Sequence, residues 1–199
     1  MPKQVDHEAR RAQIAQALMR IASRGGLEAV SLRDVAAEAG LSMGAIQHYF
    51  KTKEQMLLYA VEHANNQAAD RVRERIQADP DPSARTVLRT LMVEMLGLSE
   101  ESRTEYLTSV AFFLRAVSSA ELAAVYRQWW PKLVEFVTDE LRRAQRSGEL
   151  SARIDPEREA EILLGVPDGF SVGLLLGNRT AEASVEVIDY YLDRLFAPR

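Results

Sequence analysis

The stretch that decides the fold is residues 31–53, which read SLRDVAAEAGLSMGAIQHYFKTK. Ser31 can cap a short helix, because its hydroxyl can accept a hydrogen bond from the first backbone N–H groups of that helix. Gly40 follows the apolar positions of this helix, where a helix end favours a residue that tolerates positive φ. Ser42 can then cap a second helix over residues 43–49. Two short helices joined by a turn that contains glycine are typical of a helix-turn-helix, whose second helix enters the major groove of DNA.

The second helix of this motif carries different residue types on its two sides. Ile46 and Phe50 are four residues apart, and this spacing predicts that both pack inward. Gln47 should lie on the opposite side, where its amide can pair with adenine in the major groove. Gly44 would allow the helix to approach the DNA backbone closely. The motif therefore predicts a DNA-reading helix that Ile46 and Phe50 hold in place.

The same stretch resembles the DNA-binding signature of the TetR family of transcriptional regulators. The matching pieces are residues 31–36 (SLRDVA), 39–42 (AGLS), Gly44, 48–50 (HYF) and 51–54 (KTKE). The resemblance covers about the first quarter of the chain, and beyond it only the length and the helical pattern match. It implies a helix-turn-helix DNA-binding domain over residues 1–52. It also implies a helical domain for effector binding and dimerisation over residues 53–199.

The residues predicted to contact DNA combine base readers with phosphate ligands. Lys51 and Lys53 follow the motif and would add salt-dependent affinity without reading sequence. His48 would contact a base or a phosphate, or else pack between helices. Tyr49 would offer its hydroxyl to a phosphate, or else lie partly in the core. The complete set is Ser31, Arg33, Ser42, Met43, Gly44, Gln47, His48, Tyr49, Lys51 and Lys53.

The charge of the chain is unevenly distributed. The net charge is −4, but residues 1–53 hold eight Lys and Arg against five Asp and Glu, a charge of +3. The remainder therefore carries −7. The positive charge is concentrated in the segment that would meet the phosphates of DNA, as expected for a nucleic-acid-binding region.

The sequence offers little support for catalysis or membrane insertion. Its 199 residues include no cysteine, which excludes disulfides and thiolate metal sites. The three histidines, His7, His48 and His63, are scattered, and no catalytic triad, metal-ligand cluster or phosphate-binding glycine loop appears. The longest apolar stretch, residues 162–176, is too short to span a bilayer, and no signal peptide is evident. We therefore expect a cytoplasmic protein without catalytic residues, cofactor or metal.

Apolar residues recur at helical spacing along the whole chain and predict an all-α protein of about nine helices. Asp81 is expected to cap the fifth helix, with Pro82 at its first position. Asp155 and Pro156 repeat this pattern at the eighth helix. Pro131 should kink the seventh helix. The expected helices cover about residues 7–24, 32–39, 43–49, 53–78, 82–96, 102–117, 119–146, 156–176 and 181–196.

Large aromatic and methionine side chains are concentrated in the middle helices. Each of them taken alone is more typical of a core than of a ligand contact. Together they suit an apolar cavity between helices, where methionine adapts to irregular shapes. We expect a partly apolar small-molecule effector. The predicted effector-binding residues are Met92, Met95, Tyr106, Phe113, Tyr126, Trp129, Trp130 and Phe170.

The last two helices are the candidates for a dimer interface. The helix over residues 156–176 is apolar on nearly all sides, and such a helix is normally buried. In the TetR family the last two helices pair with their copies in a four-helix interface. This resemblance implies a homodimer interface that contains Leu163, Val166, Phe170, Leu174, Val187 and Tyr191.

These features together predict a ligand-responsive transcriptional repressor. A two-fold dimer would place its two recognition helices about one DNA turn apart, on a palindromic double-stranded operator. The effector would release the dimer from DNA through its different affinities for two conformations. One alternative is a constitutive DNA-binding helical protein without effector sensing. Another is a small-molecule enzyme on a helical scaffold.

Overall fold

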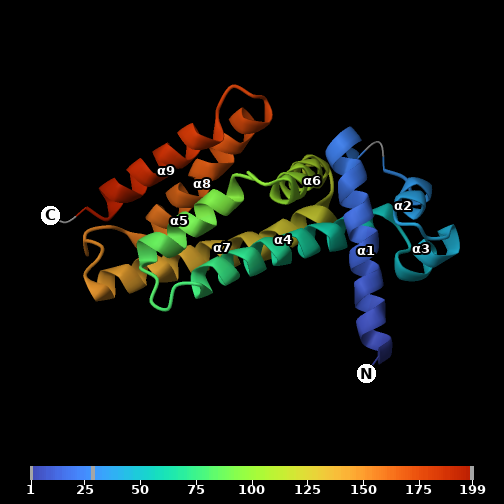
Figure 1. Ribbon diagram of the computed structural model, residues 1–199, viewed down its shortest axis with the longest axis horizontal. Helices are drawn as coiled ribbons and strands as arrows, with labels where there is room; N and C mark the ends of the chain where they lie inside the picture. The colour runs from blue at the N-terminus through green and yellow to red at the C-terminus, as the bar shows by residue number, and fades with distance from the viewer. Residues whose placement is uncertain (1, 28–29, 198–199) are drawn as a thin grey trace. The chain divides into compact units, whose positions relative to one another are not determined.

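The computed structural model describes residues 2–27 and 30–197, with side chains from His7 onward. Within these residues the chain forms nine α-helices and no strand (Figure 1). This confirms the predicted all-α fold. The helices are α1 (Pro2–Gly25), α2 (Leu32–Glu38), α3 (Met43–Tyr49), α4 (Lys53–Gln77), α5 (Ala84–Met95), α6 (Glu100–Ala116), α7 (Ala120–Ser147), α8 (Pro156–Leu175) and α9 (Ala181–Leu195).

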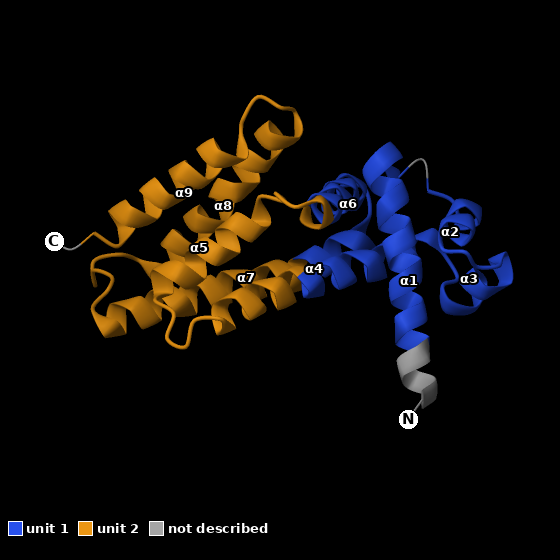
Figure 2. Cartoon of the chain, in the orientation of Figure 1, with its two compact units in different colours: residues 1–67, 103–126 blue, residues 68–102, 127–199 orange. Residues whose placement is uncertain are grey.

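The helices cluster into two compact units, which Figure 2 draws in different colours. Unit 1 consists of residues 1–67 and 103–126, and unit 2 consists of residues 68–102 and 127–199. Helices α4 and α7 each begin in unit 1 and end in unit 2. The predicted functional boundary after residue 52 stays a prediction.

The helix-turn-helix in unit 1 begins and ends as the sequence predicts. The hydroxyl of Ser31 caps α2 by accepting the N–H of Asp34 at 3.2 Å. The hydroxyl of Ser42 caps α3 by accepting the N–H of Ala45 at 3.1 Å. Gly40 adopts a φ of 65°, the left-handed conformation that ends α2. Local side-chain chemistry therefore fixes the length of both short helices.

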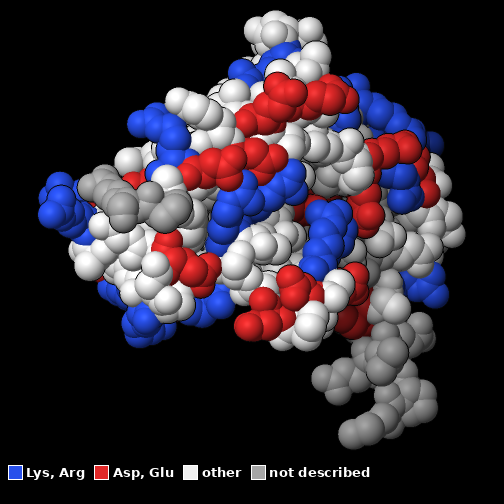
Figure 3. Space-filling view, turned by 60° about the vertical axis from the view of Figure 1, so that its left-hand side comes forward, with Lys and Arg blue, Asp and Glu red and all other residues white. Residues whose placement is uncertain are grey.

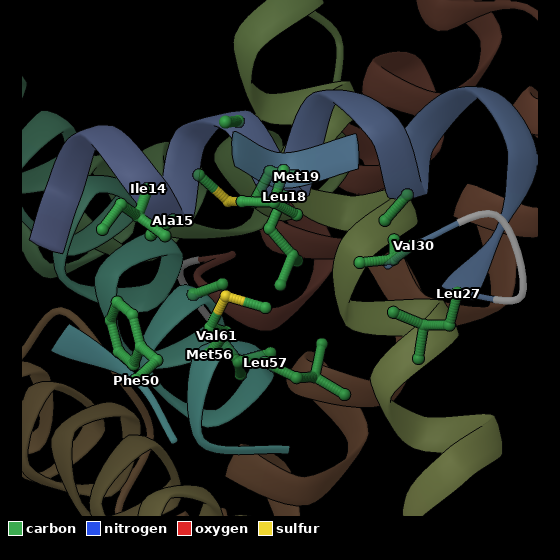
Figure 4. Close-up of a cluster of buried hydrophobic side chains, with 14 of the residues drawn as sticks. Ile14, Ala15, Leu18, Met19, Leu27, Val30, Phe50, Met56, Leu57 and Val61 are labelled. Carbon is green, nitrogen blue, oxygen red and sulfur yellow. The ribbon is translucent and has the colours of Figure 1, made fainter. Parts of the chain in front are cut away.

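The core of unit 1 holds the helix-turn-helix against α1 and α4. Figure 4 shows Ile14 and Leu18 of α1 pointing toward Met56 and Leu57 of α4, with Phe50 beside them. All five side chains are buried, each with an exposed fraction of 2% or less. Burial of one such side chain contributes about 1.5–3 kcal/mol to stability. The recognition helix α3 is thus attached to a well-packed support.

Two helix starts differ from the prediction. Helix α5 begins at Ala84, and its cap is Ser83, whose hydroxyl accepts the N–H of Thr86 at 3.1 Å. The prediction that Asp81 caps α5 is therefore wrong. The reason is that α5 begins only at Ala84, so Ser83 and not Asp81 is the residue next to its first turn, while the N–H of Asp81 donates to the side chain of Asp79 at 3.1 Å. Helix α1 begins at Pro2, before the predicted start.

The start of α8 is confirmed. The carboxylate of Asp155 accepts the N–H of Arg158 at 3.2 Å, and Pro156 occupies the first turn. Helix α7 contains Pro131 and is one helix from Ala120 to Ser147. The predicted kink at Pro131 stays a prediction.

Unit 2 is stabilised by a buried carboxylate as well as by its apolar core. The side chain of Glu94 on α5 is only 6% exposed. It accepts a hydrogen bond from Nε of Arg71 at 2.8 Å, and it also pairs with Arg75. Both arginines lie on α4, so this cluster ties the second half of α4 to α5 within unit 2.

Exposed ion pairs join α5 to α9 in the same unit. The guanidinium of Arg85 approaches a carboxylate oxygen of Asp193 to 2.6 Å. Arg89 donates to both carboxylate oxygens of Asp189, at 2.6 and 3.0 Å. Basic and acidic side chains are interspersed on the face that Figure 3 draws. Pairs of this kind contribute little individually, about 0–1 kcal/mol each, but they fix the register of two helices.

Candidate nucleic-acid interface

Helix α3 has a buried side and an exposed side, as its sequence predicts. Ile46 is fully buried, and Phe50 is 2% exposed. Gly44, Gln47 and His48 are exposed, and so is Met43 on the same short helix. The side chains of Gln47 and His48 are therefore outside the chain's own core and accessible to a groove of DNA.

Gly44 marks the place on α3 where an approaching surface would meet the least obstruction. A Cβ atom added at Gly44 would meet only the hydroxyl oxygen of Ser42, at 3.9 Å. Packing inside the chain therefore does not require glycine at this position. Close approach of an external surface, such as a DNA backbone, supplies a reason for it.

Side chains of α1 fix the position of the helix-turn-helix. The amide of Gln13 donates to the backbone carbonyl of Ala39 at the end of α2, at 2.8 Å. Nε of Arg20 approaches a carboxylate oxygen of Glu38 to 2.6 Å. This hydrogen bond holds the pKa of Glu38 below its usual value. Both contacts orient α2, and the turn at Gly40 then orients α3.

The two lysines after α3 are already engaged with backbone groups. The ammonium of Lys51 donates to the carbonyl of Gln47 at 2.8 Å, and that of Lys53 donates to the carbonyl of Leu27. Thr52 lies between them and caps the start of α4, because the N–H of Gln55 donates to the hydroxyl of Thr52 at 3.1 Å. Both positive charges therefore lie at defined places beside the helix-turn-helix.

Arg33 and Tyr49 complete the predicted DNA set. Arg33 is exposed near the start of α2. Tyr49 is half-buried and packs against the core of unit 1. Which residues of the predicted set contact DNA stays a prediction.

The structure brings together two histidines that the sequence separates. The ring centroid of His7 on α1 lies 4.6 Å from that of Tyr49 and 6.2 Å from that of His48. The rings of His48 and Tyr49 are 5.1 Å apart. The sequence pattern does not reveal this cluster, because it depends on how α1 packs against α3.

Next to this cluster, aromatic and charged side chains connect α1 to α4. The guanidinium carbon of Arg11 lies 4.2 Å from the ring centroid of Tyr59 and 5.2 Å from that of Phe50. The hydroxyl of Tyr59 donates to Glu8. Burial, followed by this hydrogen bond, raises the pKa of Tyr59 to about 12. His63 stacks on Tyr59 at 6.0 Å, and burial lowers the pKa of its imidazole.

The described part of the chain contains no group of three or more His, Asp or Glu side chains placed to hold a metal ion. Over the same residues, every helix is too short or too polar to cross a bilayer.

The sequence matches known regulator families in both of its parts. Residues 14–60 match the bacterial regulatory proteins of the tetR family, and residues 84–197 match the C-terminal part of the BetI-type transcriptional repressors. The transcriptional regulator PksA of Bacillus subtilis is 31% identical over 176 residues, which cover 88% of this chain and 83% of PksA. The chain belongs to the TetR family. It is a DNA-binding transcriptional regulator, and its C-terminal part is of a repressor type.

Solved structures share the TetR fold over almost the whole chain. A transcriptional regulator from Saccharomonospora viridis, solved in complex with choline, has a TM-score of 0.85 and 22% identity. The match covers 96% of this chain and 99% of that one. FadR from Bacillus subtilis, solved in complex with stearoyl-CoA, has a TM-score of 0.72 and 20% identity over 93% of this chain and 97% of FadR.

The eight residues predicted to bind an effector are divided between the two units of this TetR-family chain. Tyr106, Phe113 and Tyr126 belong to unit 1, where the rings of Phe113 and Tyr126 are 5.2 Å apart. The other five belong to unit 2. Met92 is 1% exposed in the core, and Met95, Trp130 and Phe170 pack against it. The rings of Trp129 and Trp130 are 6.3 Å apart. Which of the eight contact an effector stays a prediction.

The predicted dimer residues lie mostly on the inner side of α8 and α9. Leu163 is 1% exposed and belongs to the core of unit 2, so almost none of its surface is available to a second chain, and its place in an interface stays a prediction. Val166, Phe170, Leu174 and Tyr191 are half-buried against this core, and the hydroxyl of Tyr191 donates to Glu159. Among the six, Val187 is the most exposed, at 41%.

The exposed side of α8 and α9 carries apolar residues that the sequence prediction did not name. Ile162 is 50% exposed, Val172 is 52% exposed and Leu176 is 76% exposed. On α9, Tyr190 is 61% exposed. We call Ile162, Val172, Leu176, Val187 and Tyr190 the exposed apolar face. Their exposure could not be predicted because α8 has apolar residues on nearly all sides.

Proposed function

We propose that this TetR-family chain is a cytoplasmic homodimeric repressor that binds a palindromic operator and is released by a small molecule. The observation that carries this proposal is the division of α3 into an anchored side and an exposed side. Ile46 and Phe50 are buried, whereas Gln47 and His48 face solvent. A short helix held in this way can insert into the major groove without rearrangement of its own unit.

Dimerisation is supported by the exposed apolar face of α8 and α9. Gly165 and Gly169 lie on the exposed side of α8 among the apolar side chains. A Cβ added at either glycine would meet no atom of the chain within 4 Å. The chain's own packing therefore does not require these glycines, whereas close packing of a second copy would favour them. A two-fold interface here would use the same surface on both subunits.

Effector release is supported by the path of α4 and by the relatives. Helix α4 starts beside the recognition helix, contributes Met56 and Leu57 to the core of unit 1, and continues into unit 2. A displacement of its second half can therefore change the position of its first half. The relatives with choline and stearoyl-CoA show that this fold accommodates chemically different ligands. We propose a partly apolar effector.

The test of this function is selection of bound duplexes from a random DNA pool. The proposal requires an enriched inverted repeat with half-site centres about 10 base pairs, or a multiple of this, apart. Loss of binding in a subsequent small-molecule screen would identify the effector. Enrichment of a single, asymmetric site would contradict the dimeric repressor, and salt-sensitive binding without enrichment would contradict sequence reading by α3.

Gln47 provides a prediction about sequence preference. The variant Gln47→Ala should lose discrimination at one position in each half-site, because one bidentate amide–base pair contributes about 1–3 kcal/mol of discrimination. The measurement is a repeat of the selection with the variant. The matched control is Gln67→Ala on α4, outside the helix-turn-helix, which should leave the selected sequence unchanged. An unaltered preference in the Gln47 variant would remove this residue from the base readers.

Lys53 provides a prediction about salt dependence. Replacement of Lys53 by alanine should weaken binding to all duplexes and reduce the slope of log affinity against log salt by about 1. The measurement is a salt titration of duplex affinity. Because Lys53 also donates to the carbonyl of Leu27, thermal unfolding must show that the variant is folded. If affinity falls while the slope stays the same, Lys53 supports the structure and does not contact a phosphate.

A further inference from the structure

Three aromatic rings from two helices meet at the edge of the predicted DNA-binding surface. His7 of α1 lies against Tyr49 and His48 of α3, at centroid distances of 4.6 and 6.2 Å. Both histidines are exposed, and Tyr49 is half-buried between them and the core. The end of α3 that carries His48 therefore shares its solvent-facing side with a residue of α1.

The position of His7 is fixed by contacts further along α1. Gln13 donates to the carbonyl of Ala39, which attaches α1 to the end of α2. The carboxylate of Glu8 accepts a hydrogen bond from the hydroxyl of Tyr59, and the guanidinium of Arg11 lies over the ring of Tyr59. These contacts attach the segment that carries His7 to α2 and to α4. His7 is therefore held beside His48 by the contacts of the residues that follow it on α1.

From His7 onward, the ionisable groups named here on α1 and after α3 are basic or already paired. On α1, Glu8 is engaged with Tyr59, Arg10 donates to Gln13, and Arg11 lies over rings. After α3, the ammonium of Lys51 is held at the carbonyl of Gln47. Among the side chains that the structure describes, the carboxylate beside His7 is that of Glu8, and it is turned toward Tyr59 of α4, so a proton on His7 or His48 adds positive charge to this surface.

We propose that His7 is an additional DNA-contacting residue, and that His7 and His48 together make DNA affinity rise as the pH falls. This inference rests on the proposed function, because it needs DNA at the exposed side of α3. Phosphates favour the protonated form of a nearby imidazole, so the complex holds more protons than the free protein and DNA. By linkage, affinity then increases as pH falls through the range in which histidines titrate, about pH 8 to 5.

The competing explanation is that His7 only packs on Tyr49. In that case the aromatic ring of His7 would support DNA affinity by packing, but the protonation of His7 would not change the affinity. The variant His7→Phe separates the two, because it retains an aromatic ring beside Tyr49 and cannot be protonated. His63→Gln is the control for a histidine elsewhere in unit 1, since His63 stacks on Tyr59 and lies on α4.

The experiment measures the affinity of the full chain for a labelled duplex of random sequence, at constant ionic strength, from about pH 8 to about pH 5.5. An imidazolium near a phosphate in an exposed site contributes about fivefold in affinity. For each subunit bound, the wild type should therefore gain about 25-fold over this range, and His7→Phe should gain about fivefold. His48→Gln should also gain about fivefold, and the His63→Gln control should match the wild type.

Two failures are distinguishable. If the wild type binds DNA with the same affinity at every pH, or if His7→Phe keeps the full pH dependence, this proposal is wrong and the proposed function is unaffected. If the wild type binds no duplex at any pH, the proposed function is wrong and this proposal falls with it. Thermal unfolding of each variant over the same pH range ensures that loss of affinity is not loss of folding.

Discussion

Val172→Arg should be a folded monomer that has lost most of its affinity for an operator. Val172 lies on the exposed apolar face, and 52% of it is accessible in the single chain. A charge at this position costs the isolated chain little. In a two-fold dimer the same charge appears twice in one interface and must lose its hydration there.

The expected size of this effect follows from the cost of burying an unpaired charge. Such a charge costs about 3–5 kcal/mol, so the dissociation constant of the dimer should rise about a thousandfold or more. Operator affinity should fall with it, because two linked recognition helices bind about 100- to 10,000-fold more tightly than one. Sedimentation equilibrium and duplex titration measure the two quantities.

Val117→Arg is the matched control for this variant. Val117 follows α6 in unit 1 and is 89% exposed, so the same substitution adds the same charge to an apolar residue of the other unit. This control should stay dimeric. If Val172→Arg is also dimeric at micromolar concentration, the exposed apolar face is not the interface.

Glu94→Ala should lower the free energy of unfolding of unit 2 by about 3 kcal/mol. The carboxylate of Glu94 is 6% exposed and pairs with Arg71, whose side chain is only 18% exposed. Removal of the carboxylate leaves the charge of Arg71 in a poorly hydrated place. Arg71 keeps a weaker contact with Glu101 at 3.5 Å, so we expect the lower part of the usual 3–5 kcal/mol range.

The control variant is Glu101→Ala, which removes the other carboxylate that pairs with Arg71. Glu101 is 63% exposed, and its replacement by alanine should cost less than about 1 kcal/mol. Both tryptophans of the chain, Trp129 and Trp130, belong to unit 2, so their fluorescence in a urea titration reports on this unit. Equal effects of the two substitutions would mean that burial of Glu94 has no special role.

The helices were predictable because their ends are determined locally. Ser31, Ser42 and Asp155 each cap the helix that follows, and Gly40 ends α2, as the sequence indicates. Asp81 was predicted wrongly because two side chains competed for the start of α5. Because α5 begins at Ala84, Ser83 is the residue beside its first turn, and its hydroxyl accepts the N–H of Thr86.

The exposed and buried sides of α3 were predictable for a similar reason. Apolar Ile46 and polar Gln47 differ clearly in character, so periodicity separates them. On α8 this contrast is absent, because Leu163 and Ile162 are equally apolar. Only the packing of α8 shows that Leu163 is buried and that Ile162 is exposed. The contact between His7 and His48 was likewise invisible, because it depends on the packing of two distant segments.

Gly44 has a consequence for how this protein responds to selection in the laboratory. Glycine in a helix is less stable than alanine by roughly 0.5–1 kcal/mol. Since a Cβ at Gly44 would meet only one atom, at 3.9 Å, alanine could be accommodated without a clash. A screen that rewards thermal tolerance alone would therefore favour loss of this glycine and, under the proposed close approach of DNA at Gly44, would select against DNA recognition. A screen for variants with higher thermal stability should therefore also require that each variant binds the operator.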